Sequence, residues 1–281
     1  MKTQIILRKV HYAFSAFLCT ACLVSCNDWL KPEPLSFYSP ENTYVTKEGL
    51  EGALVSCRAM IRPEFIGNNS YACTELMTSD VAVAGNIVAQ TLKNFEIQLK
   101  PGAYGDSQIG TFWSKGYSAI QKANTIISRV QAADEITEND KNTILAEGYF
   151  HRSYWYYKLV NQFGDVPFID KEVTTPKLDF YSHTRSSILK RLREDMMFAT
   201  RYLPESAPHG AVSKAAGNHL LAKICLACCD FDGAVAATTA VIDHSQHKLM
   251  EKRFGVNISD AQYNIISAVS YTHLTLPTNR E

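Results

Sequence analysis

The sequence lacks an excess of charge of either sign. Its 28 basic residues balance 28 acidic residues over 281 positions, and no block of lysines and arginines occurs. Because proteins that bind nucleic acid carry a basic patch or stripe, we expect no nucleic acid partner. The hydrophobic fraction of 46% instead indicates a folded globular chain, long enough for one or two domains.

Catalytic signatures are also missing from the chain. It contains no G-x-S-x-G, no H-E-x-x-H, no Walker motif and no G-x-G-x-x-G. The acidic pair Asp134 and Glu135 lies in polar sequence, whereas a glycosidase needs two carboxylates that face each other across a cleft. We therefore expect a protein that is not an enzyme and that needs no cofactor.

The N-terminal apolar run is too short to span a membrane. Tyr12 to Val24 falls well below the roughly 20 residues that a spanning helix needs, and it follows a basic stretch at residues 2–9. The run ends in Leu23-Val24-Ser25-Cys26, which resembles a bacterial lipobox. We predict a signal peptide over residues 1–25 and a lipid on the thiol of Cys26. The alternative is an ordinary secretion signal that contains a cysteine.

The cysteine pattern does not support a disulfide framework. After the signal peptide and Cys26 are set aside, an odd number remains: Cys57, Cys73, Cys225, Cys228 and Cys229. Cys225-x-x-Cys228 has the spacing of a zinc or redox motif. It lies inside a helical pattern with no second CxxC or histidine pair nearby, so we predict helix-packing residues and no metal site.

The strongest positive signal is one long helix from Lys141 to Gln162. Apolar residues recur there with helical period, no proline interrupts it, and Gly164 and Pro167 stop it. Its aromatic residues surround the whole helix: Tyr149, Phe150, Tyr154, Trp155, Tyr156 and Tyr157. We predict that neighbouring helices cover both faces, and that these rings form core rather than a sugar platform.

Shorter helical patterns lie on either side of this helix. We expect helices over Thr46–Ile61, Ser107–Gln131, Ser182–Leu203, Val212–Cys228 and Phe231–Ile242. Thr46 and Asp230 are expected N-caps, and either Thr137 or Asn139 caps the long helix. Asn124 lies on an apolar stripe, where an unpaired amide costs about 1–3 kcal/mol, so we predict an interhelical hydrogen bond.

Three further expectations concern side-chain placement. The last helix should bury a stripe formed by Phe231, Ala234, Val235, Thr238, Val241 and Ile242. Basic residues at Arg185, Lys190, Arg191 and Arg193 should form a solvated helix face balanced by Glu194 and Asp195. The aperiodic stretch 62–103 has a loop pattern in which Asp80 or Phe95 could touch a ligand, although ordinary loop structure is the better expectation for each.

Several motifs together resemble the SusD/RagB family of outer-membrane nutrient-binding lipoproteins of Bacteroidetes. The long helix and its stop carry Glu147, Phe150, Arg152, Tyr154, Tyr156, Leu159, Val160 and Phe163-Gly164-Asp165-Val166-Pro167. Trp113, Tyr117, Ile120 and Asn124 match a second family pattern, and Asp195, Ala199 and Leu203-Pro204 match a third. The segment 220–243 is similar to a tetratricopeptide repeat.

The resemblance implies an all-α array of tetratricopeptide-like helical hairpins with long loops. Residues 26–45 would be an extended tether, 46–269 a truncated SusD-like domain, and 270–281 resemble translated sequencing adapter. The implied function is capture of a glycan or other oligomeric nutrient at the cell surface. The implied partners are a TonB-dependent (SusC-like) transporter and the outer membrane. The alternatives are a helical-repeat structural adaptor without a ligand and a lipid-anchored polysaccharide hydrolase.

Overall fold

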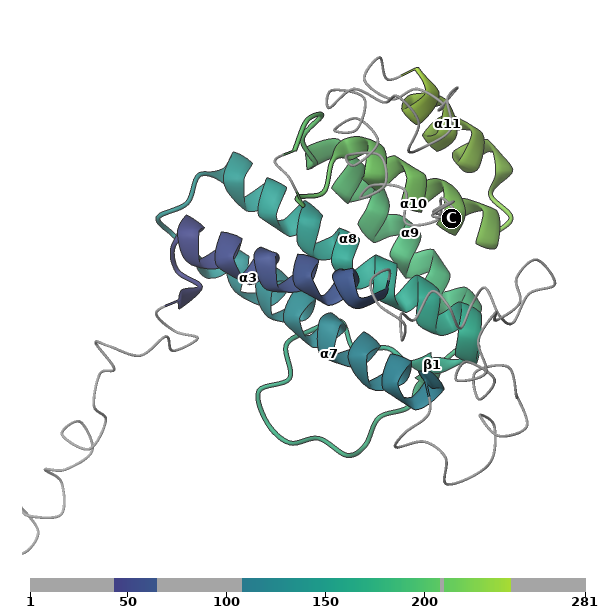
Figure 1. The fold of residues 1–281 in the computed structure, drawn as a ribbon, viewed down its shortest axis with the longest axis horizontal. Coiled ribbons are helices and arrows are strands. Elements are labelled where there is room, and N and C mark those ends of the chain that lie inside the picture. Colours follow the sequence, from purple (N-terminus) through teal and green to yellow (C-terminus); the bar gives the residue numbers. More distant parts are fainter. Residues whose placement is uncertain (1–42, 65–107, 208–209, 244–281) are drawn as a thin grey trace, which may run out of the picture. The chain divides into compact units, whose positions relative to one another are not determined.

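The computed structural model describes residues 43–64, 108–207 and 210–243 (Figure 1). The helices are α3 (Lys47–Ile61), α7 (Gln108–Arg129), α8 (Glu138–Phe163), α9 (Arg185–Tyr202), α10 (Lys214–Ala227) and α11 (Phe231–Ile242), with short 3-10 turns η1 (Arg62–Glu64) and η3 (Val130–Ala132). Two strands, β1 (Val166–Pro167) and β2 (Ser182–His183), pair antiparallel. The predicted all-α class is confirmed. Cys26, Cys73, Asp80, Phe95 and the 270–281 segment lie outside the described residues.

Helix ends follow the local capping chemistry of the sequence. The hydroxyl of Thr46 accepts a hydrogen bond from the Gly49 amide, and the carboxylate of Asp230 accepts one from the Gly233 amide. Thr137, rather than Asn139, caps α8 by accepting from the Asp140 amide. At the other end of α8, Gly164 adopts φ 73°, a left-handed conformation that glycine enters cheaply.

Helix α8 lies between the two halves of the array. It contacts α3 and α7 on one side and α9 and α10 on the other, and α11 packs on α10 beyond them (Figure 1). The rings of Phe150, Tyr154, Trp155 and Tyr156 are all buried. Tyr149 and Tyr157 are half-buried against the same core, so the prediction that neighbouring helices cover both faces and that these rings form core is confirmed.

The predicted start of α9 is wrong. The helix begins at Arg185 with Thr184 as its N-cap, whereas the sequence pattern suggested Ser182. Ser182 and His183 instead form β2, in register with Pro167 and Val166. This pairing joins residues that are distant in sequence, so local periodicity does not reveal it.

The predicted buried stripe of α11 is confirmed at Ala234 and wrong at Phe231, Val235, Thr238 and Ile242. Ala234 and Ala237 are the buried positions, whereas Phe231, Val235 and Ile242 are 63%, 63% and 76% exposed. Small alanines face α10 because they let the two helices approach closely. The larger apolar side chains consequently point away from α10.

Candidate functional site

The candidate site is the segment that joins α8 to α9, residues 164–184, together with the buried side chains that fix it. We call this segment the α8–α9 connection. It leaves α8 at Gly164, passes through β1, forms a wide loop and returns through β2 to α9 (Figure 1). From residue 174 to residue 184 every position is exposed.

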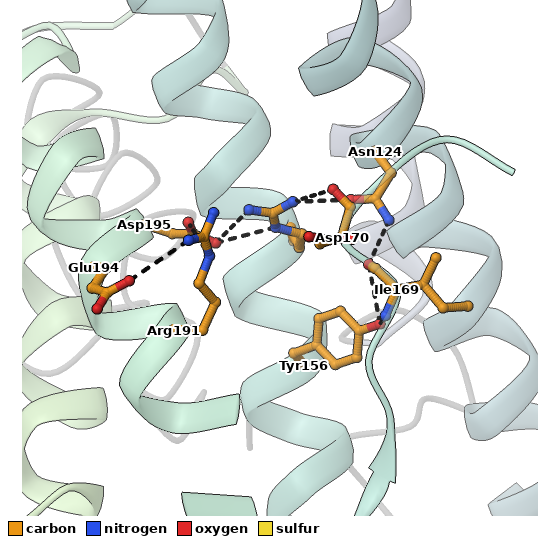
Figure 2. Close-up of polar contacts among 8 residues, drawn as sticks. Asn124, Tyr156, Ile169, Asp170, Arg191, Glu194 and Asp195 are labelled. Carbon is orange, nitrogen blue, oxygen red and sulfur yellow. Dashed lines mark hydrogen bonds and ion pairs between the residues drawn. The ribbon is translucent and has the colours of Figure 1, made fainter. Parts of the chain in front are cut away.

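Arg152 lies at the centre of a buried polar cluster beneath the connection. Its side chain is 1% exposed. It donates from Nε and Nη2 to Asp195 Oδ2 on α9, at 3.1 Å and 2.6 Å. From Nη1 it donates to Asn124 Oδ1 on α7 at 3.3 Å and to the Asp170 carbonyl at 2.9 Å. One guanidinium therefore ties α8 to α7, to α9 and to the connection, as Figure 2 shows for the surrounding residues.

Two further side chains complete the cluster. The bond that Asn124 accepts from Arg152 of α8 confirms the predicted interhelical contact, and Asn124 also donates from Nδ2 to the Ile169 carbonyl at 2.7 Å. The Tyr156 hydroxyl accepts from the Ile169 amide at 2.6 Å (Figure 2). The backbone of Ile169 is thus held through both its polar groups, so this part of the connection has a fixed position.

Side chains of α7 hold the connection at two further points, Pro167 and Glu172. The Tyr117 hydroxyl donates to the Pro167 carbonyl at 2.8 Å. Further along, Arg129 Nε donates to Glu172 Oε2 at 2.8 Å, and the Glu172 amide donates to Ser128 Oγ at 3.1 Å. These contacts fix the residues between β1 and Glu172 against α7.

The electrostatics of the cluster follow from its burial. Burial raises the pKa of the Asp195 carboxyl, and the adjacent Arg152 guanidinium opposes that rise. Arg191 adds a second cation, 3.3 Å from Asp195 Oδ1. Burial also raises the pKa of Tyr117 and Tyr156, which keeps both phenols protonated as hydrogen-bonding groups.

The expectation that Asp195 lies on a solvated helix face is wrong, although it does pair with Arg191 as expected. Asp195 is buried and pairs with Arg152, although Lys190 and Arg191 on the same helix are exposed. Arg193 pairs with Asp230 of the α10–α11 turn at 2.9 Å. Arg191 pairs with Glu194 and Asp195 on its own helix, so the predicted balance holds for Arg191, whereas Arg193 pairs with another element.

Two other buried carboxylates are paired in the same way. Glu147 accepts from Arg58 Nε at 2.6 Å and from Nη2 at 2.8 Å, and His151 Nε2 lies 3.4 Å from it. Glu64 accepts from the Tyr154 hydroxyl and from Lys158 Nζ. Cations or hydroxyls of neighbouring helices hold each carboxylate. These carboxylates therefore join packed elements to one another.

Cys57, Cys225 and Cys228 occupy packing positions, whereas Cys229 is exposed. Cys57 lies in the core of α3, and burial raises the pKa of its thiol to about 12. Cys225 is buried in α10, its pKa raised by burial to about 11, and Cys228 packs against the same core. Among residues 43–64, 108–207 and 210–243, no group of histidine, cysteine or acidic side chains could hold a metal ion.

One shallow groove lies between α3 and α7. Its volume is about 310 Å³, and its lining includes Tyr44, Gln121, Lys122 and Thr125. The Arg129 guanidinium lies 5.4 Å from the centroid of the Tyr44 ring, which fixes that wall of the groove.

Within the described part of the chain, each helix is too short or too polar to cross a bilayer.

Comparison with known proteins decides the family. A SusD-like family model, described as "Starch-binding associating with outer membrane", matches residues 50–226. The chain belongs to the SusD-like family. The resemblance seen in the sequence motifs is thereby confirmed.

Related proteins of the family differ from this chain in length. SusD-like protein P2 of Formosa agariphila is 28% identical over 267 residues, which are 93% of this chain and 50% of that protein. The chain thus spans about half the length of this curated relative.

Solved structures of other proteins share the fold. A laminarin-binding SusD-like protein superposes with a TM-score of 0.60 at 22% identity, over 72% of this chain and 46% of its own. Surface glycan-binding protein A from Bacteroides uniformis gives 0.61 at 18% identity, over 73% and 48%. The likeness confirms the predicted array of helical hairpins.

The residues that carry the family motifs are those that build the cluster. Asn124, Arg152, Tyr156 and Asp195 come from three separate motifs in the sequence. Asn124 and Asp195 bind the Arg152 guanidinium, and Tyr156 joins the cluster through the Ile169 backbone. The motifs identified these residues without revealing that they meet. The sequence did offer one signal, the charged Arg152 inside an aromatic run. A charged side chain in such a place needs a buried partner, so a polar cluster could have been predicted there.

Proposed function

We propose that this chain is the helical part of a cell-surface lipoprotein that captures a glycan without cleaving it. The observation that carries the proposal is the family match over residues 50–226, whose description names starch binding and the outer membrane. The names of two solved relatives, one laminarin-binding and one glycan-binding, support the same substrate class. The buried carboxylates Glu64, Glu147 and Asp195 support binding rather than catalysis, because each is held by neighbouring side chains.

The proposal includes an anchor and a transporter partner. A lipid on Cys26 would hold the protein on the outer membrane, since each buried methylene contributes about 0.8 kcal/mol. A TonB-dependent transporter would receive the captured oligosaccharide. Metabolic labelling with a palmitate analogue should mark the wild-type chain and leave a Cys26→Ala variant unlabelled. Equal labelling of both would contradict the anchor.

Affinity electrophoresis tests the binding itself. The chain is run through native gels that contain laminarin, amylopectin or xylan, with bovine albumin as a non-binding standard. We expect slower migration in at least one polysaccharide and no release of reducing ends from it. Unchanged migration in every gel would favour a structural adaptor, and reducing ends would indicate a hydrolase.

A further inference from the structure

The α8–α9 connection presents to solvent two aromatic side chains that are adjacent in sequence. Phe180 is 40% exposed and Tyr181 is 77% exposed. Elsewhere among the described residues the exposed aromatic side chains, Tyr202 and Phe231, stand apart from one another in sequence and on different helices. An exposed aromatic pair on one loop is therefore a distinct feature of this segment.

The rings project from a fixed base. Tyr181 directly precedes β2, which pairs with β1, and β1 leads into the backbone held by Arg152, Asn124 and Tyr156. Phe180 is further oriented by Lys177, whose Nζ lies 5.5 Å from the ring centroid. Less entropy is lost when a ligand binds to a surface whose ends are already held.

Polar side chains accompany the rings. Asp179 and Ser182 flank the aromatic pair, and the His183 imidazole follows, with its Nδ1 accepting from the Phe168 amide at 3.4 Å. A pyranose ring has an apolar face of C–H groups surrounded by hydroxyls. Aromatic rings match that face, and carboxylate, hydroxyl and imidazole groups match the hydroxyls.

We propose that the edge formed by Phe180 and Tyr181, with Asp179 and Ser182, is a glycan-binding surface of this protein. The assignment rests on the proposed function and names where the sugar binds. A protein partner fits these observations less well. Stable protein interfaces bury roughly 800 Å² on each partner, whereas the exposed apolar side chains of this loop are Leu178, Phe180 and Tyr181, interrupted by Asp179 and preceded by Lys177.

Titration calorimetry with laminarin and amylopectin tests this assignment on the full chain. We expect Tyr181→Ala to weaken binding at least about tenfold, and Phe180→Ala to weaken it less, because the Lys177 ammonium already covers part of that ring. Tyr181→Phe keeps the ring and should retain affinity within about threefold. Tyr202→Ala removes an exposed ring on α9 and serves as the matched control. Thermal unfolding checks that each variant folds. Because Tyr181 is a surface residue, its variants should unfold at the wild-type temperature.

The outcomes separate this assignment from the function on which it rests. A wild-type chain that binds neither polysaccharide would overturn both. Wild-type affinity in Tyr181→Ala would overturn the assignment alone. A double variant Gln121→Ala, Lys122→Ala that loses binding while Tyr181→Ala retains it would place the sugar in the α3–α7 groove. Unchanged glycan affinity with loss of a co-purifying transporter would make the edge a protein-docking surface.

Discussion

Helices α8 and α11 are both rich in apolar residues, yet α8 is largely buried and α11 is largely exposed. α8 is covered by α3, α7, α9 and α10, and even its charged Arg152 and Glu147 are buried. α11 packs on α10 through two alanines and exposes Phe231, Val235 and Ile242. The comparison shows that apolar content does not decide burial. Burial depends on the number of neighbouring helices. Buried charged side chains are tolerated where those helices supply hydrogen-bonding or ionic partners.

The largest loss of stability is expected when a large buried side chain of α8 is truncated. Trp155 is fully buried and its ring packs 5.9 Å from that of Phe112, so Trp155→Ala should lower the free energy of unfolding by about 3–5 kcal/mol. Urea unfolding followed by circular dichroism measures the change. Val235→Ala on α11 is the control and should change it by less than about 0.5 kcal/mol. Similar losses in both variants would invalidate the contrast between the helices.

Removal of the buried cation should have the next largest effect. Arg152→Met leaves Asp195 and Asn124 without their central partner, and we expect a loss of about 3 kcal/mol. The remaining Arg191 near Asp195 limits the loss. In Arg152→Met, Asp195→Leu the uncompensated carboxylate is gone, so part of the stability should return. A double variant less stable than the single variant would contradict this account.

Acid should weaken the Arg58–Glu147 pair. Burial raises the pKa of Glu147, but the hydrogen bonds from Arg58 and the His151 contact outweigh it, so the net pKa lies below its ordinary value. The contribution of Glu147 is therefore present above the ordinary glutamate pKa of about 4.3 and is lost as the pH falls through the folded-state value. Glu147→Gln should cost about 2 kcal/mol at pH 7, with a smaller difference from wild type near pH 3. A difference independent of pH would contradict the pairing.

A small gain is expected at the turn between α10 and α11. Cys229 adopts φ 59°, and the Asp230 amide donates to the Cys225 carbonyl at 2.9 Å, a helix ending that glycine serves best. Cys229→Gly should raise the free energy of unfolding by about 0.5 kcal/mol, and Cys229→Val should lower it. Thermal unfolding of both variants checks the order. A valine variant as stable as the glycine variant would argue against the left-handed backbone.

The smallest effect on stability belongs to the exposed face of α11. Val235→Lys and Ile242→Lys should each change the free energy of unfolding by less than about 0.5 kcal/mol, because both side chains are exposed. Sedimentation velocity should show less self-association, since exposed apolar patches promote it. Strong destabilisation would mean that another element covers this face.

Local chemistry made much of the fold predictable. Thr46 and Asp230 cap helices through side chains three residues from the amides they bind, and Gly164 ends α8 through its own backbone. Such signals lie within one turn of chain. The start of α9 and the buried face of α11 could not be predicted in this way, because β2 pairs with a distant strand and α10 selects which face of α11 it covers.

The site was predictable only as a set of residues. The sequence singled out Arg152, Asn124 and Asp195 within separate motifs, but their meeting depends on how three helices pack. No local pattern indicated that Phe180 and Tyr181 are exposed, because the same residue types in α8 are buried. Exposure there follows from the wide loop between β1 and β2.

Hydrogen exchange of the α8–α9 connection tests most directly whether the polar cluster of α8 fixes it. The amides of Ile169 and Glu172 donate to Tyr156 and Ser128, so a peptide over residues 166–172 should exchange slowly in the wild type. In Arg152→Met this peptide should exchange at least about tenfold faster, while peptides of α8 stay protected. Equal exchange of residues 166–172 in the two proteins would contradict the account.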